Sequence, residues 1–249
     1  MVIKNVHELE KMRTAGKLLA EIFESIPSKI QAGISTASLD AWIEQQLIQR
    51  QLVSQSKGYK GYLHVSCISV NDVVVHGVPS PLVILQQGDL VKVDVCAAWQ
   101  GYCADMARCF FVGDQPTEQL AHLVAVAYQA LDLGIAQAVE GKRLFDISAH
   151  IQHHVEQFGY GVVRDFAGHG IGKRMHEDPD VPNFGTAGTG MRLKAGMTFA
   201  IEPMITQGSY EIYVESDGWT VKTKDGSYAA HVEDTVVVGQ NGPEILTRW

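Results

Sequence analysis

The sequence has few cysteines, and their spacing matches neither a disulfide framework nor a zinc site. The four are Cys67, Cys96, Cys103 and Cys109, and no C-x-x-C pair occurs among them. A small disulfide scaffold is not expected in a chain of 249 residues. We therefore expect reduced, buried thiols, as in proteins of the cytoplasm.

Segments typical of secretion, membranes and nucleic-acid binding are also missing. Residues 1–12 are polar and amphipathic, without the basic segment and apolar core of a signal peptide. The apolar stretch near 120–139 is interrupted by Gln129 and Asp132, so it falls short of the ~20 residues that a membrane span needs. A net charge of −8 without a run of Lys or Arg argues against binding nucleic-acid phosphates. We expect a cytoplasmic protein with no membrane contact and no direct nucleic-acid specificity.

The composition that remains is that of a globular protein. Hydrophobic residues make up 46% and charged residues 19%, which excludes a disordered chain. The 24 glycines among 249 residues are a larger share than the usual value of about 7%, so we expect many tight turns or close backbone approaches. No linker rich in Pro or Ser divides the chain. We therefore expect one domain over residues 1–249.

Two helices followed by strands occur twice along the chain. Apolar spacing and capping residues predict four helices: 6–25, one that begins after Gly33 with Ser35 or Thr36 as its cap, one from Thr117 to 138, and one that Asp146 caps and Gly159 ends. Apolar, β-branched runs predict strands in 67–70, 73–75, 82–85, 90–95, 103–112, 160–166, 197–206, 210–215, 219–223 and 229–238. This pattern predicts an α+β fold with similar halves, about 1–112 and 113–249, around one continuous sheet.

Two aspartates lie in an apolar β-hairpin whose turn is predicted near residues 99–101. Asp94 and Asp105 are symmetric about that turn, so we expect them to face each other, directly or within one residue. Because facing carboxylates repel, a positive group is expected between them. Two candidates stay open here: ion pairs with Lys92 and Arg108, or a metal ion.

A glycine-rich segment at 167–172 surrounds a histidine. His169 lies between two glycines, and His176 follows seven residues later on what we expect to be the same loop. Glycines on both sides would let the backbone approach a bound group, although a single histidine is more often an ordinary core or surface residue. A phosphate-binding loop is excluded, because the glycine spacing is one residue short and Arg174 occupies the place of Ser or Thr.

Two glutamates complete the set of candidate ligands. Glu202 and Glu233 lie in apolar strands, where a carboxylate is costly to bury unless it is paired or coordinated. An edge position facing water is the alternative for each. Together with the aspartates and His169, they suit two divalent cations bridged by carboxylates, and thiolates of a structural zinc site are absent. Such a pair lowers the pKa of a bridging water and polarises a carbonyl, which favours hydrolysis of an amide or ester.

The order and spacing of these motifs resemble the type I methionine aminopeptidases over essentially the whole chain. The matching stretches are 58–62, 69–72, 76–79, Asp94 with Asp105, 168–172 with His176 and Glu177, 197–203, 217–220, and Glu233. The resemblance implies a single catalytic metallopeptidase domain of pita-bread fold, a curved antiparallel sheet with helices on the outside and pseudo-twofold halves. The short interval from His176 to Glu202 supports type I, because type II enzymes carry a long insertion there.

The resemblance also implies roles for the ligands and the catalytic groups. As metal ligands it implies Asp94, Asp105, His169, Glu202 and Glu233, with Asp105 and Glu233 bridging and His169 and Glu202 on the same metal. Glu202 is also the carboxylate expected to handle the proton of the water.

The same resemblance implies which residues contact the substrate. His76 and His176 are expected to contact the substrate amide and the developing tetrahedral intermediate. The pocket for the methionine side chain is expected to contain Tyr59, Tyr62, Cys67 and Trp219, where sulfur–aromatic contacts are favourable, with Met175 in its wall.

Three departures from the family pattern fall outside the ligand positions. Met175 occupies the place of a usual Phe, residues 63–66 read Leu-His-Val-Ser in place of Pro-Lys-Ser-Val, and Asp234 replaces a frequent His. They affect the expected shape of the pocket. Three further histidines on the predicted fourth helix, His150, His153 and His154, could clip a stray ion, but a solvated helix face is the favoured interpretation.

The implied activity is metal-dependent removal of the N-terminal methionine from nascent proteins. We expect a small second residue to be preferred, and a metal-bridging water to attack the first peptide bond. The cofactors would be two divalent ions (Co, Zn, Mn or Fe), with a monovalent cation as a further candidate. The partners would be nascent polypeptide N-termini and the ribosome, and we expect a monomer. The rival hypotheses are an aminopeptidase with another first-residue preference and a non-catalytic binding module.

Overall fold

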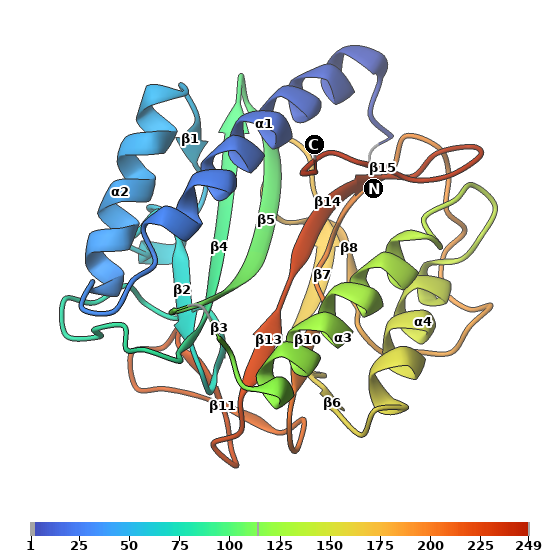
Figure 1. The fold of residues 1–249 in the computed structure, drawn as a ribbon. Coiled ribbons are helices and arrows are strands. Elements are labelled where there is room, and N and C mark those ends of the chain that lie inside the picture. The colour runs from blue at the N-terminus through green and yellow to red at the C-terminus, as the bar shows by residue number, and fades with distance from the viewer. Residues whose placement is uncertain (1–2, 114, 249) are drawn as a thin grey trace.

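Residues 3–113 and 115–248 are described in a computed structural model of the chain (Figure 1). The helices are α1 Val6–Ser25, η1 Ile26–Ser28, α2 Thr36–Gln49, η2 Tyr59–Gly61, α3 Glu118–Ile135 and α4 Leu144–Glu156. The strands are β1 Val53–Ser54, β2 Cys67–Val70, β3 Val73–Val75, β4 Leu90–Trp99, β5 Tyr102–Phe111, β6 Gly161–Val162, β7 Ala167–Gly170, β8 Glu177–Pro182, β9 Thr198–Ile201, β10 Met204–Thr206, β11 Ile212–Val214, β12 Val221–Thr223, β13 Ala229–His231, β14 Glu233–Val237 and β15 Glu244–Ile245.

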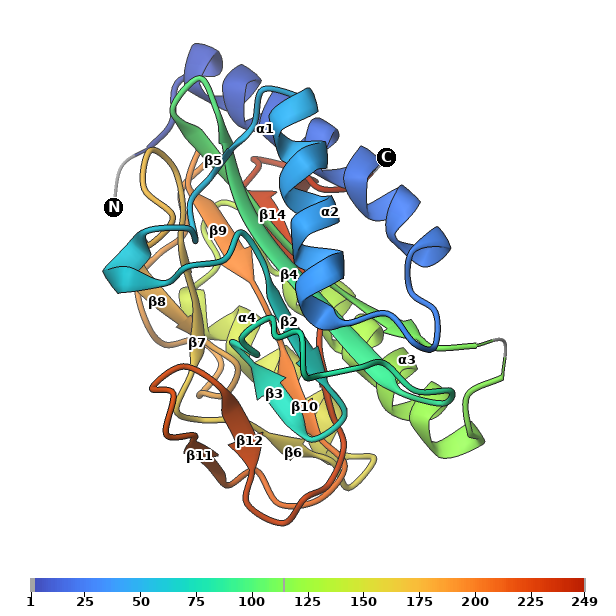
Figure 2. The same ribbon diagram turned by 90° about the vertical axis from the view of Figure 1, so that its left-hand side faces the viewer.

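One large antiparallel sheet organises the molecule. Its strands follow the order β1-β4-β5-β14-β9-β7-β8, with β2 on β4 and β15 on β14. There are two smaller sheets, β13-β10-β6 and β11-β12-β3, and their strands gather at the lower end of the molecule in Figures 1 and 2. Figure 2 shows the large sheet curving away from the helices, with α1, α2 and α3 on its outer side. The predicted α+β class and the curved antiparallel sheet with external helices are therefore confirmed.

Each pair of helices packs its own hydrophobic core against the sheet. Helices α1 and α2 cover a core that includes Leu19 and Val93. Helices α3 and α4 cover a second core that includes Leu123 and Phe199. The position of the boundary between the two halves, expected near residue 112, stays a prediction.

Local chemistry explains where the helices begin. Asn5 caps α1 with a reciprocal pair of hydrogen bonds, because its side chain accepts from the Glu8 amide and Glu8 accepts from the Asn5 amide. Ser35 caps α2 as predicted. Asp146 is the third residue of α4 and not its cap. Its carboxylate accepts from the Arg143 amide at 2.8 Å and so stabilises the helix start from inside.

Several strand predictions need correction. Residues 82–85 form no strand: Ile84 makes a single bridge to Ser35, and Leu82 is 88% exposed. The strands β7 and β8 were not predicted. His169 was expected on a loop, but it lies on β7. Within the described residues, none of the helices has the length and apolarity needed to cross a bilayer.

Candidate metal centre

Strand alternation directs the predicted ligands away from the helices. On β4, Val91, Val93 and Val95 pack into the core beneath α1 and α2. Since successive side chains of a strand point to opposite faces, Asp94 points to the inner, concave face of the sheet. The same face carries Asp105 on β5. The outer face of the sheet therefore packs against the helices, and the inner face carries the proposed ligands.

The two aspartates lie diagonally and do not face each other directly. Strands β4 and β5 join through a two-residue turn, because Trp99 pairs with Tyr102, so Asp94 is opposite Ala107 and Asp105 is opposite Cys96. The offset is two residues, which corrects the expected register but keeps both carboxylates on one face. The positive φ of Gln100 and Gly101 is typical of such tight hairpin turns.

Neighbouring strands bring the remaining predicted ligands to the same place. Glu233 on β14 pairs with Ala107 of β5, and His169 on β7 pairs with Ala200 of β9. Glu202 directly follows β9. One cavity of about 350 Å³ is lined by all five predicted ligands: Asp94, Asp105, His169, Glu202 and Glu233.

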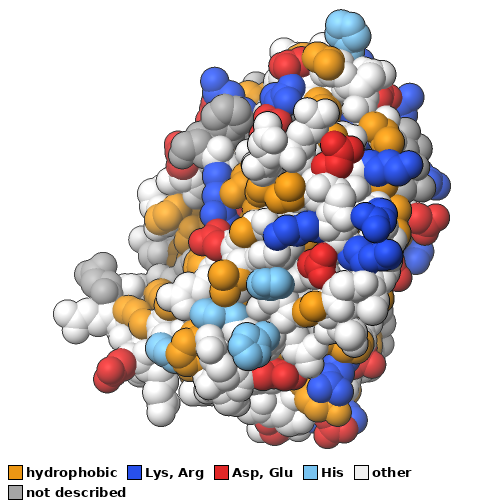
Figure 3. All heavy atoms as spheres, turned by 90° about the vertical axis from the view of Figure 1, so that its right-hand side faces the viewer, with side chains coloured by type: hydrophobic (Ala, Val, Ile, Leu, Met, Phe, Trp, Pro, Cys, Tyr) orange, Lys and Arg blue, Asp and Glu red, His pale blue; other side chains and the backbone are white. Residues whose placement is uncertain are grey.

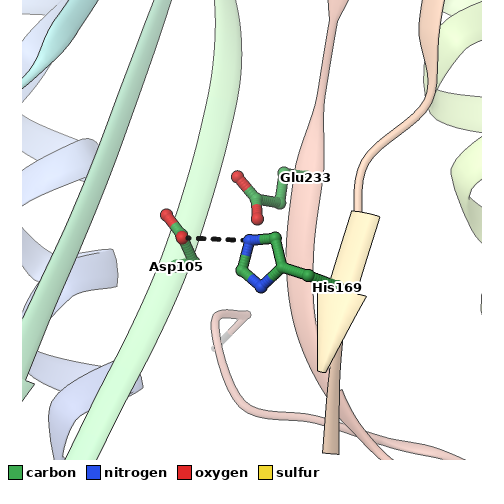
Figure 4. Close-up of side chains that lie close together, drawn as sticks. All are labelled: Asp105, His169 and Glu233. Atoms are coloured by element: carbon green, nitrogen blue, oxygen red, sulfur yellow. Dashed lines mark ion pairs between the residues drawn. The ribbon is translucent and has the colours of Figure 1, made fainter. Parts of the chain in front are cut away.

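Three of these side chains converge closely (Figure 4). Asp105, His169 and Glu233 each offer a ligand atom within 4.8 Å of the others. The Nε2 atom of His169 lies 3.7 Å from Asp105 Oδ2 and 3.6 Å from Glu202 Oε1. Its Nδ1 donates to the Gly170 carbonyl at 3.0 Å, which leaves the Nε2 lone pair available for a cation. Burial lowers the pKa of His169 to about 3, so the ring is neutral.

The carboxylates carry a repulsion that a cation would relieve. Burial raises the pKa of Asp105 to about 6. Burial, followed by the charge of the neighbouring carboxylates, raises the pKa of Asp94, Glu202 and Glu233 well above the usual range. The Glu233 Oε1 atom is buried and has no hydrogen-bond partner among the described residues. Carboxylates together with an imidazole are donors that divalent metals accept, so these residues fit the cations that the sequence implied.

The ion-pair alternative for the aspartates is wrong. Lys92 Nζ donates to the Asn71 carbonyl at 2.8 Å. Arg108 binds Asp234 at 2.5 Å. Over residues 3–113 and 115–248, no ion pair joins a Lys or Arg to Asp94 or Asp105. Neither basic side chain neutralises the cluster.

The glycines beside His169 serve packing between strands. A Cβ atom on Gly168 would lie 2.4 Å from the Ala200 carbonyl oxygen, and one on Gly170 would lie 2.6 Å from that of Asp178. A Cβ atom essentially never comes this close to an atom to which it is not bonded. The glycines therefore let β7 fit between β8 and β9, which carries His169 to the cavity. Their expected close approach to a bound group stays a prediction.

The predicted catalytic histidines lie at the same cavity. His176 follows β7, and its Nδ1 lies 3.0 Å from the Tyr59 hydroxyl. Its ring centroid is 4.4 Å from that of His169. His76 follows β3 with a positive φ of 57°, and burial lowers its pKa to about 4.

The residues expected to receive the methionine side chain line the cavity as well. They are Tyr59, Tyr62, Cys67, Met175 and Trp219. The Tyr62 ring lies 4.9 Å from that of Trp219, and its hydroxyl donates to the Ser66 carbonyl at 2.9 Å. The cavity thus combines aromatic and sulfur-containing side chains with the acidic cluster.

Sequence reasoning missed two residues at the centre. Cys96 lines the cavity opposite Asp105. His231, which is 2% exposed, places Nε2 3.3 Å from Glu202 Oε2. The sequence signal for His231 was its position two residues before Glu233.

The histidines of α4 lie elsewhere, on the face drawn in Figure 3, where histidine side chains gather. His150 bonds to the Asp146 carbonyl at 2.8 Å, and His154 lies 3.1 Å from the Gln129 side chain. In the described part of the chain, the one group of three or more potential ligands that converge is the cluster on the inner sheet face.

Comparison with known proteins identifies the family of this chain. Metallopeptidase family M24 matches residues 10–240. A methionine aminopeptidase of Clostridium acetobutylicum is 47% identical over 247 residues, which are 99% of this chain and 98% of the relative. That of Escherichia coli K12 is 43% identical over 246 residues, covering 98% and 93%.

Solved structures show the same fold. A methionine aminopeptidase of Thermotoga maritima superposes with a TM-score of 0.97 at 41% identity, covering 100% of both chains. An X-Pro aminopeptidase of the same organism shares the fold alone, with a TM-score of 0.79 at 20% identity, and this chain covers 62% of it. The predicted pita-bread fold is confirmed. The chain belongs to metallopeptidase family M24 and, within it, to the methionine aminopeptidases.

Proposed function

We propose that this chain removes the N-terminal methionine from polypeptides, with Asp94, Asp105, His169, Glu202 and Glu233 holding two divalent cations. One observation carries the proposal: four carboxylates and a neutral imidazole line a single cavity, and their closest members, Asp105, His169 and Glu233, converge within 4.8 Å. The names of close relatives support the same activity. Co, Zn, Mn and Fe all suit this ligand set, and a monovalent cation stays a prediction without assigned residues.

The chain's own groups would divide the work around the scissile bond. When bound, the cations would lower the pKa of a water molecule and polarise the first peptide carbonyl. Glu202 would accept the proton of that water, because its carboxylate lies beside His169 among the proposed ligands, with 3.6 Å between His169 Nε2 and Glu202 Oε1. His176 is held through Nδ1 by Tyr59, which leaves Nε2 to hydrogen-bond the oxygen on which charge develops.

The substrate's first two residues would be selected by different side chains of the cavity. The methionine thioether would lie against Tyr62 and Trp219, because sulfur–aromatic contacts are favourable. His76 would contact the substrate amide as a neutral donor, consistent with its lowered pKa. A small second residue is preferred in this arrangement, because its side chain must fit against the crowded acidic cluster.

The cellular setting is proposed on the same basis. Nascent polypeptide N-termini would be the substrates, with the ribosome as the candidate partner that presents them. A cytoplasmic monomer is the expected form.

Peptide hydrolysis tests the proposal. The protein loaded with Mn²⁺ or Co²⁺ should cleave Met-Ala-Ser faster than otherwise equal peptides that begin with Leu or Pro, and Asp105→Asn should abolish cleavage. A faster rate on the Leu or Pro peptide would indicate the rival aminopeptidase specificity. Metal binding without cleavage of any of the three peptides would indicate a binding module.

A further inference from the structure

His231 is a buried histidine that none of the roles above uses. It is the last residue of β13 and pairs with Met204 of β10, the second residue after Glu202. This pairing brings its ring beside the Glu202 carboxylate, with 3.3 Å between Nε2 and Oε2. Nε2 is buried, and among the described residues it makes no hydrogen bond that meets the usual geometry. At that distance, Glu202 Oε2 is the acceptor available to this nitrogen.

The Glu202 carboxylate lies between two imidazoles that differ in chemistry. His169 faces Oε1 at 3.6 Å, and its Nδ1 proton is used on the Gly170 carbonyl, so its Nε2 presents a lone pair. His231 faces the other oxygen. A lone pair on His231 Nε2 would repel that oxygen, whereas an Nε2–H would donate to it and satisfy both atoms.

We propose that His231 is a positioning residue, which donates its Nε2–H to Glu202 Oε2 and so keeps Oε1 turned toward the metal ligands. The inference rests on the proposed assignment of Glu202 as a ligand. Partners of this kind fix the rotamer of a coordinating side chain, and their loss typically costs about 10- to 100-fold in metal affinity or activity. The substrate is not contacted by His231 in this role.

Two replacements separate the donor from the volume of the ring. His231→Gln keeps an N–H donor of similar reach, and His231→Leu keeps an apolar volume without a donor. We expect His231→Leu to lower kcat on Met-Ala-Ser about 10- to 100-fold with KM changed less than about threefold, and to weaken Mn²⁺ binding to the apoprotein by a similar factor. His231→Gln should restore both values to within about threefold of the wild type.

A double-mutant cycle shows whether His231 acts through Glu202. In calorimetric Mn²⁺ titrations, His231→Leu should weaken binding in the wild-type background and change it little in the Glu202→Gln background. The cycle also uses His231→Met, so that a poorly folding Leu variant has a substitute with the same lack of a donor.

The outcomes distinguish this inference from the function on which it rests. Unchanged kcat and Mn²⁺ affinity in both apolar variants would overturn the role of His231, as would equal losses in the Gln and apolar variants. If Glu202→Gln itself kept wild-type cleavage and Mn²⁺ affinity, the assignment of Glu202 would be wrong, and the inference would fall with it.

Discussion

Arg108 on β5 and Asp234 on β14 form a buried ion pair, with 2.5 Å between Nη2 and Oδ1. Arg108 also donates to the backbone carbonyls of Ala107 and Glu233. Arg248 binds the second oxygen of Asp234 at 2.6 Å. The aspartate that departs from the family pattern thus joins three segments directly behind the proposed ligand Glu233.

We predict that Asp234→Asn lowers the free energy of unfolding by about 3–5 kcal/mol, because it leaves the largely buried Arg108 without a counter-charge. Urea unfolding of the apoprotein measures the change. Asp132→Asn is the matched control: Asp132 binds Arg248 at 2.6 Å, but its side chain is 58% exposed, so its loss should cost less than about 1 kcal/mol. Equal costs for the two variants would contradict this account.

Because Lys92 is buried, we predict that the free energy of unfolding rises with pH. It is 1% exposed, and burial lowers its pKa to about 7, whereas an unfolded lysine titrates near pH 10.4. Between these values the unfolded state binds more protons, so the free energy of unfolding increases with pH, by about 4–5 kcal/mol at most. Below about pH 7 both states are protonated, and this slope disappears.

Urea unfolding from pH 7 to 10 tests that sign. The slope should be smaller in Lys92→Met than in the wild type, while Lys224→Met should keep the wild-type slope, since the Lys224 side chain is 53% exposed. An unchanged slope in Lys92→Met would show that the buried amine keeps an ordinary pKa.

The glycine before His169 should tolerate no side chain. In Gly168→Ala, the new Cβ would meet the Ala200 carbonyl oxygen at 2.4 Å, so β7 and β9 must move apart and His169 must shift with them. We expect a loss of about 1–3 kcal/mol in unfolding free energy and a larger relative loss of peptidase activity. Gly242→Ala serves as control, because nothing lies within 4 Å of its Cβ; similar effects at both sites would refute the packing argument.

The Tyr59 hydroxyl should influence catalysis through His176. Tyr59→Phe removes a hydrogen bond of 3.0 Å to His176 Nδ1, worth about 0.5–1.5 kcal/mol. We expect kcat on Met-Ala-Ser to fall about 2- to 10-fold. Tyr213→Phe, which removes a surface hydrogen bond to Glu215, should leave kcat unchanged. Full activity in Tyr59→Phe would show that His176 is oriented by other contacts.

The proposed ligands could be predicted from the sequence because charged side chains stand out within otherwise apolar strands. Asp94 and Glu233 interrupt apolar strands, and a buried charge needs a partner. Periodicity also predicted α1 with its observed bounds. The identity of the partner could not be read in this way, since excluding Lys92 and Arg108 required knowing where their side chains lie.

Other features depend on contacts between distant segments. A hairpin turn placed one residue too early shifts the register of Asp94 and Asp105 by two positions, and only backbone pairing corrects it. Strand β7 has a glycine on each side of His169, so its β-propensity is low and its pairing comes from its neighbours. The contact of His231 with Glu202 depends on its pairing with Met204 across two strands, which the sequence alone does not show.

The most direct test of the account is the number of Mn²⁺ ions bound per chain, measured by equilibrium dialysis of the apoprotein with elemental analysis. We predict two ions for the wild type, and fewer, together with no cleavage of Met-Ala-Ser, for Asp105→Asn, because Asp105 is assigned as a ligand shared by both ions. Undiminished Mn²⁺ binding in Asp105→Asn, or cleavage by a wild-type protein that binds no metal, would contradict it.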